Sequence, residues 1–414
     1  MRQSNAKLTA LVLALACIGA VPAFADPTKY PPPNNNCRNT GSFEGWLAGF
    51  RQAAAASGVS RATISAALDG MTLDPGIIAR DRRQSFFAQS FTAFSAKLIS
   101  QNRLQTGAAQ LKKHNNLLAK VEQQYGVQGP VIVAFWALES DFGAGMGNLP
   151  VLRSLATLAY DCRRSEMFRD ELMDALRIID RGDLRPEEMI GSWAGELGQT
   201  QFLPSHYLKY AVDYDGDGRR NLMKSAADVV ASTANFLVEL GWQRSQPWLQ
   251  EVKVTRNLPW DQADLAIQHP RSKWAAWGVS QLNGQPLPAD AMPASLVLPM
   301  GRFGPAFLAY QNFQIYLKWN QSLNYALTAA HLAARLGGAP AMSRGSAQVP
   351  EWSLEQMREL QQLLARRGYG VGEIDGKMGA ATRAGVKAAQ LKFGLPADSY
   401  PTPELLERLR GQQR

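Results

Sequence analysis

Residues 128–143 read QGPVIVAFWALESDFG and predict a buried helix that carries one acidic side chain near its end. Pro130 suits a first helical turn, because the N–H that proline lacks has no helical partner at that position. The next two turns are apolar. Glu139 lies on the same helix face as Phe135 and Ile132, four and seven positions earlier. A carboxyl held among apolar side chains is hard to ionise, so its pKa rises. Glu139 is therefore either a general acid that is protonated at neutral pH or simply the last polar residue of the helix.

Length and charge limit the kind of protein. The 414 residues fit roughly two to four domains, and the net charge of +9 favours acidic partners such as an anionic cell wall. Because no basic block with interleaved aromatic residues occurs, we expect no nucleic-acid partner. The four histidines are scattered without metal-ligand spacing, and no Ser-His-Asp or Cys-His arrangement stands out.

The first 25 residues form a secretory signal, with a basic start, an apolar centre and Ala-Phe-Ala before Asp26. This predicts a periplasmic protein. The alternative is an outer-membrane lipoprotein acylated at Cys17, but Ala14 stands where a lipoprotein site has a large aliphatic residue, which favours cleavage after Ala25. No later apolar run is long enough to cross a bilayer, so we expect no transmembrane segment after removal of the signal.

The remaining chain divides by pattern into one large and one small unit. Residues 26–40, rich in proline and asparagine, predict a disordered lead-in. Amphipathic stripes over 41–340 predict a mainly α domain, including one long helix over 81–98, with a small mixed or β insertion at 241–310. Residues 341–352 form a linker, and 353–411 predict three short helices around a compact core.

Two cysteines, Cys37 and Cys162, remain after the signal. An exported chain with two cysteines can form one disulfide, although the sequence does not show that the two lie close together.

The segment 191–204, GSWAGELGQTQFLP, combines small residues with neutral polar side chains. Its glycines allow a ligand to approach the backbone closely. Ser192, Gln199 and Gln201 offer neutral hydrogen-bonding groups that suit a sugar. Tight helix packing is the alternative, and it explains the glycines but not the two glutamines.

An alternating acidic loop follows at AVDYDGDGRRNL. Asp213, Asp215 and Asp217 match the first half of a calcium loop. Its twelfth position is Lys224 instead of the bidentate Glu, so Asp228 would have to close a longer loop. The pattern therefore predicts either a structural Ca²⁺ site or an Asp/Gly turn that caps the following helix.

Three ordered blocks carry a resemblance to a known family. They read Ala-Leu-Glu-Ser-x-Phe-Gly from residue 137, Gly-Ser-Trp-Ala-Gly-x-x-Gly-Gln-x-Gln-Phe-x-Pro-Ser from residue 191, and Asp-x-Asp-Gly-Asp-Gly from residue 213. Residues 42–340 thereby resemble the lytic murein transglycosylase B family. The tail, with Leu-Gln-x-Leu-Leu from residue 360 and Ile-Asp-Gly-x-x-Gly-x-x-Thr from residue 374, resembles the peptidoglycan-binding-1 module.

The resemblance implies a lysozyme-like helical fold that acts on peptidoglycan glycan strands in cell-wall turnover. Such enzymes cut the β-1,4 bond between N-acetylmuramic acid (MurNAc) and N-acetylglucosamine (GlcNAc) without water, leave a 1,6-anhydromuramoyl end and require no cofactor. Glu139 matches the catalytic acid and base. The matching cleft positions are Ser192, Gln201, Phe202, Asn320 and Tyr325. Trp319 stands where a Tyr is common, which implies a stacking role, and Lys224 departs from the family's metal loop.

The sequence leaves two other functions open. A hydrolase of the same bond needs a second carboxylate. Asp141 lies about 200° around the helix from Glu139 and should point away, which leaves Glu196 as the candidate. A non-catalytic wall-binding protein is the third possibility. No pattern identifies a regulatory or wall-synthesis protein as a partner.

Overall fold

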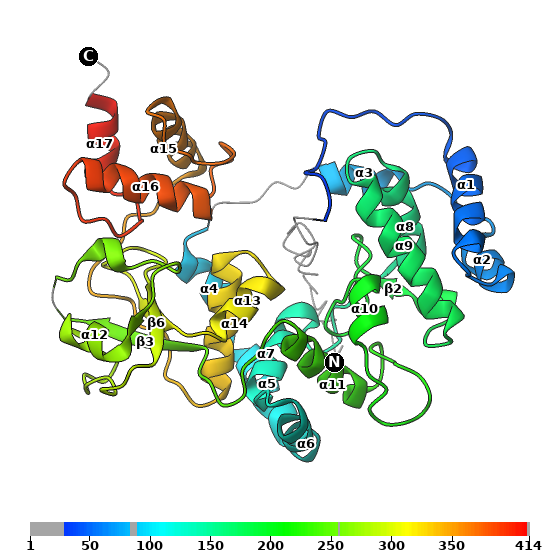
Figure 1. The fold of residues 1–414 in the computed structure, drawn as a ribbon, viewed down its shortest axis with the longest axis horizontal. Helices are drawn as coiled ribbons and strands as arrows, with labels where there is room; N and C mark the ends of the chain where they lie inside the picture. The colour runs from blue at the N-terminus through cyan, green and yellow to red at the C-terminus, as the bar shows by residue number, and fades with distance from the viewer. Residues whose placement is uncertain (1–28, 83–88, 256, 412–414) are drawn as a thin grey trace, which may run out of the picture.

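A computed structural model describes residues 29–82, 89–255 and 257–411, and these form a mainly helical protein with one small β-subdomain (Figure 1). This confirms the predicted fold class. The predicted signal at 1–25, with Cys17, lies outside the described residues, as does the start of the lead-in at 26–28. Within the described ranges, no helix is both long enough and apolar enough to cross a membrane.

The helix predicted from residues 128–143 lies at the centre of the large domain. Helix α7, Gly129–Ser140, buries almost every side chain from its start to Ala137. A helix that is apolar all round must be covered on all sides. The helices packed around it are α5 (Gln101–Lys113), α6 (Asn115–Tyr125), α11 (Ala226–Glu239) and α14 (Leu323–Leu336).

A second group of helices forms the part of this domain that carries the N-terminal residues (Figure 1). Its members are α1 (Phe43–Ala56), α2 (Arg61–Leu68), α3 (Pro75–Arg82), α8 (Val151–Tyr160), α9 (Ser165–Asp180) and α10 (Pro204–Tyr210). The two-residue strands β1 (Leu149–Pro150) and β2 (Ile190–Gly191) pair antiparallel and join α8 to the segment that follows the 3-10 turn Pro186–Glu188.

The predicted single helix over 81–98 is wrong. Helix α3 ends at Arg82, and α4 spans Phe91–Leu98. Ser90 explains the new start, because its Oγ accepts a hydrogen bond from the Ala93 N–H at 3.3 Å and so caps the first turn of α4. The intervening residues 83–88 lie outside the described part of the chain.

The described part of the lead-in, residues 29–40, has no helix or strand but bonds to the helical domain. Cys37 and Cys162 form a disulfide, which joins the lead-in to the start of α9. The Asn34 N–H donates to the Arg163 carbonyl oxygen at 3.0 Å, and the Tyr30 hydroxyl donates to Asp170 at 2.7 Å. The proline-rich composition gave no sign of these contacts, because their partners lie more than 120 residues away in the sequence.

The insertion predicted at 241–310 contains a five-stranded antiparallel sheet of order β4-β6-β7-β3-β5. The strands are β3 (Leu249–Val254), β4 (His269–Pro270), β5 (Val279–Gln281), β6 (Pro293–Val297) and β7 (Ala306–Ala309). Helix α12, Arg271–Ala276, and a 3-10 turn at Trp260–Gln262 accompany the sheet. Trp274 is fully buried and belongs to the core of this subdomain.

Three C-terminal helices have their own apolar core and lie beside the β-subdomain, away from α1 and α2 (Figure 1). They are α15 (Leu354–Arg366), α16 (Ala380–Lys392) and α17 (Pro403–Gly411). Polar contacts fix them there, since Lys387 forms an ion pair with Asp264 at 2.7 Å and Arg302 forms one with Asp398 at 3.1 Å. The C-terminal unit is therefore docked on the large domain.

Candidate active site

Glu139 occupies the last turn of α7, at the point where the helix ends beside a cleft. Asp141, Phe142 and Gly143 all have positive φ values of 47°, 61° and 90°, which stop the helix at once. The apolar turns before Glu139 anchor its backbone in the core. The carboxyl group is thus carried by a rigid element and presented at the cleft.

Two donors from another part of the chain hold the Glu139 carboxyl. The Trp319 Nε1–H donates to Glu139 Oε1 at 2.8 Å, and the Tyr325 hydroxyl donates to the same oxygen. Trp319 ends helix α13 (Phe313–Trp319), and Tyr325 lies in the first turn of α14. Within the described residues, Glu139 Oε2 accepts no hydrogen bond. Because Oε1 receives both donors, the proton of the neutral acid belongs on Oε2.

The pKa of Glu139 is raised to about 7. Burial is the main cause, because it penalises the charged carboxylate. The hydrogen bonds from Tyr325 and Trp319 act in the opposite direction, and the nearby charge of Glu196 raises the pKa further. The raised pKa of Glu139 agrees with the direction that the sequence predicted. The Glu139 carboxyl can therefore both donate and accept a proton near neutral pH.

Glu139 lines a large open cleft of about 3190 Å³. Its walls come from the large domain, from the β-subdomain, from the C-terminal helices and from the described part of the lead-in. Of the six predicted substrate-binding residues, four line this cleft: Ser192, Gln201, Asn320 and Tyr325. The fold therefore gathers around Glu139 residues that are far apart in the sequence.

Among these four residues, Gln201 is the one with a buried side-chain oxygen that lacks a hydrogen-bond partner. Its backbone has a positive φ of 52°, and its Nε2 donates to the carbonyl oxygens of Gly198 and Met146. Its Oε1 is buried and has no hydrogen-bond partner in the described chain. An unpartnered buried acceptor is costly, so a donor group of a ligand would stabilise it.

Ser192 shapes the cleft more than it offers a free hydroxyl. Its Oγ accepts hydrogen bonds from the N–H groups of Ala194 and Glu196, and its hydroxyl bonds to the Glu196 carboxyl. Ser192 thus holds the tight turn that presents Glu196.

Gln199 and Phe202 are corrections to the predicted set, because both lie beneath the cleft surface. Gln199 Oε1 accepts from the Trp136 Nε1–H at 2.8 Å, and its Nε2 donates to the Met223 carbonyl oxygen at 3.1 Å. Phe202 is completely buried and its ring packs against those of Phe236 and Trp319. Both residues therefore support the site from below.

Trp319 corrects the predicted stacking role. Its side chain is fully buried, with its ring centroid 4.1 Å from that of Phe135, so no sugar face can reach it. Its function at the site is to donate a hydrogen bond to Glu139.

The two other carboxylates near Glu139 have different surroundings. Asp141 forms an ion pair with the buried Arg103 at 2.6 Å, a partner that the sequence analysis missed. Glu196 lines the cleft, and burial raises its pKa, while Ser192 and the charge of Arg164 act to lower it. Glu196 therefore lines the same cleft as Glu139, and its charge acts on the Glu139 carboxyl.

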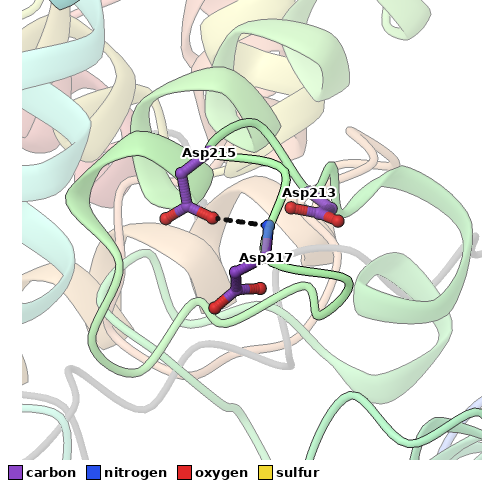
Figure 2. Close-up of side chains that lie close together, drawn as sticks. All are labelled: Asp213, Asp215 and Asp217. Atoms are coloured by element: carbon purple, nitrogen blue, oxygen red, sulfur yellow. Dashed lines mark hydrogen bonds between the residues drawn. The ribbon is translucent and has the colours of Figure 1, made fainter.

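The predicted calcium loop brings three of its four acidic residues together. Asp213, Asp215 and Asp217 each offer an oxygen within 4.8 Å of the others, and Figure 2 shows the three side chains around the loop, with the Asp217 N–H bonded to Asp215. Asp228 is a correction. It lies outside this cluster, and its two oxygens accept hydrogen bonds from the N–H groups of Tyr214 and Asn221.

Comparison with known proteins now identifies the family. Residues 42–334 match the transglycosylase SLT domain, and residues 353–409 match the putative peptidoglycan binding domain. The chain belongs to the transglycosylase SLT domain family. It is a lytic murein transglycosylase, an enzyme that cleaves glycosidic bonds of peptidoglycan, with a C-terminal peptidoglycan-binding domain. The predicted family and enzyme class are confirmed, which favours an enzyme over a non-catalytic wall-binding protein.

Individual relatives of this transglycosylase agree with that assignment. It is 31% identical over 254 residues to membrane-bound lytic murein transglycosylase B of Escherichia coli, covering 61% of this chain and 67% of the relative. The crystal structure of SltB3 from Pseudomonas aeruginosa in complex with NAG-anhNAM-pentapeptide is 43% identical, with a TM-score of 0.83, and the match covers 90% of this chain and all of that one. The Escherichia coli lytic transglycosylase Slt35 in complex with calcium is 25% identical, with a TM-score of 0.60 over 75% of this chain and 97% of that one.

Proposed function

We propose that this transglycosylase cleaves the MurNAc-β-1,4-GlcNAc bond without water and forms 1,6-anhydromuramoyl ends, with Glu139 as the only acid and base. One observation carries the proposal. Glu139 has a pKa of about 7, its Oε1 is held by two donors, and its Oε2 is left for a substrate. A single carboxyl with this arrangement can perform both proton transfers.

In the first step, Glu139 Oε2 donates its proton to the glycosidic oxygen, and the bond between that oxygen and C1 of MurNAc breaks. Positive charge then develops at C1, and the substrate's own N-acetyl oxygen is the group placed to stabilise it. In the second step, the Glu139 carboxylate accepts the proton of the MurNAc C6 hydroxyl while O6 bonds to C1. The acid is thereby regenerated, and no water is consumed.

The two hydrogen bonds to Glu139 Oε1 assist the reaction after the first proton transfer, when Glu139 is a charged carboxylate. The Tyr325 hydroxyl and the Trp319 indole stabilise the carboxylate, which exists only after the first proton transfer. Burial stabilises the neutral acid before it. Since these two influences oppose each other, the pKa comes to lie near neutral pH, where one group serves as acid and base with equal ease.

Gln201 and Asn320 are suited to bind the sugars beside the broken bond. The buried Oε1 of Gln201 lacks a partner and would accept a hydrogen bond from a hydroxyl or an N-acetyl N–H. Asn320 lies in the turn between Trp319 and Tyr325, and its Oδ1 accepts from the Ser322 N–H at 2.9 Å. Asn320 lines the cleft.

A hydrolase that uses Glu139 and Glu196 is the second candidate, because both carboxyl groups share the cleft. Its second carboxylate must be charged to activate water. Burial raises the pKa of Glu196, which disfavours that charge. The structure of the relative SltB3 in complex with NAG-anhNAM-pentapeptide supports the first candidate by similarity.

We further propose that Asp213, Asp215 and Asp217 hold a structural Ca²⁺. The support is a set of three hard oxygen donors within 4.8 Å and the calcium complex of the relative Slt35. A thermal unfolding series with and without Ca²⁺ tests this. We expect Ca²⁺ to raise Tm for the wild type but not for Asp213→Asn/Asp217→Asn, and an equal Tm with and without Ca²⁺ would contradict it.

The sequence also indicates where in the cell this enzyme acts. A signal at residues 1–25 directs export, so we propose that the enzyme acts on glycan strands in the periplasm during cell-wall turnover and remodelling. Acylation at Cys17 would instead fix it to the outer membrane. Mass spectrometry of the mature N-terminus distinguishes Asp26 from a lipidated Cys17.

The chemistry is tested by mass spectrometry of the soluble products that the mature protein releases from purified sacculi. We expect anhydro-muropeptides from the wild type and none from Glu139→Gln, which keeps the shape of the side chain but carries no transferable proton. Hydrated muropeptides with reducing ends would instead establish the hydrolase, and Glu196→Gln would then abolish them.

A further inference from the structure

Residues 29–40, called the N-terminal strap here, lie before the part of the chain that matches the SLT domain, which begins at residue 42. The strap has no helix or strand, and its bonds to the helical domain lie on either side of the prolines at 31–33. It therefore lies outside the matched SLT domain but is attached to it.

The strap is fixed to the start and the surface of α9. At its beginning, the Tyr30 hydroxyl and Lys29 both bond to Asp170. In its middle, the Arg163 Nε–H donates to Asn35 Oδ1 at 2.8 Å. The disulfide Cys37–Cys162 follows.

The last attachment comes two residues after the disulfide. The Cys162 N–H donates to Asn39 Oδ1 at 2.9 Å. All these bonds point toward α9 and its N-terminal loop, which leaves the opposite side of the strap unoccupied by them.

The first part of the strap also lines the catalytic cleft. Residues 30–35 line the same cleft as Glu139, and the three prolines at 31–33 are exposed within it. Proline has no N–H to satisfy and a fixed φ, so a run of prolines holds an extended shape without internal hydrogen bonds. Such a run presents ring faces and carbonyl oxygens that are already in place, which lowers the entropy lost when a ligand binds.

The strap also lies at the end of a continuous line of charged groups that reaches the catalytic acid. Arg163, which the strap holds, shares Asp81 with Arg164. The charge of Arg164 acts on Glu196, and that of Glu196 acts on Glu139. Asn35 of the strap, Arg163, Arg164 and Glu196 all line the same cleft.

We propose that the N-terminal strap is a binding wall for the glycan strand, held in place by the Cys37–Cys162 disulfide, and that it sets the affinity for long strands without taking part in the chemical step. The proposal rests on the proposed function, because it assumes that a glycan occupies the cleft beside Glu139. Proline rings pack against the CH faces of sugar rings, and the carbonyl oxygens of residues 31–33 accept hydrogen bonds from hydroxyl and N-acetyl N–H groups. The occupant is a sugar that lies away from the bond being cut.

The experiment compares two substrates, long uncross-linked glycan strands and a tetrasaccharide of two GlcNAc-MurNAc units. The variants are Pro31→Gly/Pro32→Gly/Pro33→Gly, which keeps the disulfide, and Cys37→Ser/Cys162→Ser, which removes it. The matched control is Asn36→Ala/Arg38→Ala, which changes two exposed strap residues that do not line the cleft. KM, kcat and Tm are measured for each protein.

For both strap variants we expect KM for long strands to rise about fivefold or more, with kcat within twofold and no change on the tetrasaccharide. The control should match the wild type on both substrates. An unchanged KM for long strands in the proline variant would overturn the proposal. So would a parallel loss of kcat and Tm on both substrates, which would show a purely structural role.

The test of the proposed chemistry is independent of the test of the strap. It is decided by the mass of the products from the wild type alone. If the wild type released hydrated products, the KM comparison would still decide whether the strap binds the strand.

Discussion

Replacing Tyr325 by phenylalanine should move the pH dependence of this enzyme toward alkaline pH. The Tyr325 hydroxyl donates to Glu139 Oε1, and this bond lowers the pKa of Glu139 because it favours the charged carboxylate. The substitution removes that donor alone and leaves the ring in place. The pKa of Glu139 should therefore rise.

The size of the change follows from the strength of the bond. A hydrogen bond to a charged group contributes roughly 1.5–3 kcal/mol, and one pKa unit corresponds to about 1.4 kcal/mol. The Trp319 donor remains, so we expect a rise of about 1–2 units from the value of about 7. If only the protonated acid cleaves, the wild type should lose about 50-fold in kcat/KM between pH 7 and pH 9, and a variant with a pKa near 8.5 only about fourfold.

The assay is kcat/KM between pH 5 and pH 9.5 on soluble glycan strands, with anhydro products measured by mass spectrometry. This ratio reports the protonation of the free enzyme. Tyr316→Phe is the matched control, since the Tyr316 hydroxyl is buried and has no hydrogen-bond partner among the described residues. Its alkaline limb should coincide with that of the wild type. An alkaline limb of Tyr325→Phe that stays in place, or moves to lower pH, would refute the reasoning.

Three further predictions concern residues around the site. Glu196→Gln removes a charge that raises the pKa of Glu139, so the alkaline limb should move to lower pH while anhydro products persist; loss of all product would instead favour the hydrolase. Gln199→Ala leaves two buried groups without partners, so chemical denaturation should show a loss of about 2–4 kcal/mol with KM unchanged, and a raised KM would return Gln199 to the substrate-binding set. Glu171, buried and bonded to Ser205, has a pKa raised to about 7, so its contribution to stability is present below about pH 4.5 and lost as pH rises to about 7; Glu171→Gln should flatten this part of the stability curve, and an unchanged curve would contradict it.

The central helix and its acid could be predicted because their causes are local. A proline in the first turn, two apolar turns and a terminating glycine define α7 without reference to any other segment. The burial of Glu139 follows from the same run, and so does the direction of its pKa shift. Residue patterns likewise predicted the β insertion and the three C-terminal helices.

The sequence did not show whether a given polar residue faces the cleft or lies beneath its surface. Gln199 and Gln201 are two positions apart in one glycine-rich segment, and both looked suited to a sugar. The positive φ of Gln201 places its side chain at the cleft, whereas Gln199 is taken up by Trp136 and Met223. Helix α7 and the acidic loop pack on either side of this segment, and this packing decides which of the two glutamines faces the cleft.

What the sequence by itself determined is the presence of a buried acid, a helical domain around it, a β insertion and a small C-terminal unit, because each depends on composition and periodicity over a few turns. The tertiary structure decided the rest. It brought Trp319 and Tyr325 from about 180 residues away onto one oxygen of Glu139. It also joined Cys37 to Cys162, which attaches the lead-in to the helical domain beside the cleft that residues 30–35 line. Such contacts depend on how distant elements pack, and no local pattern records them.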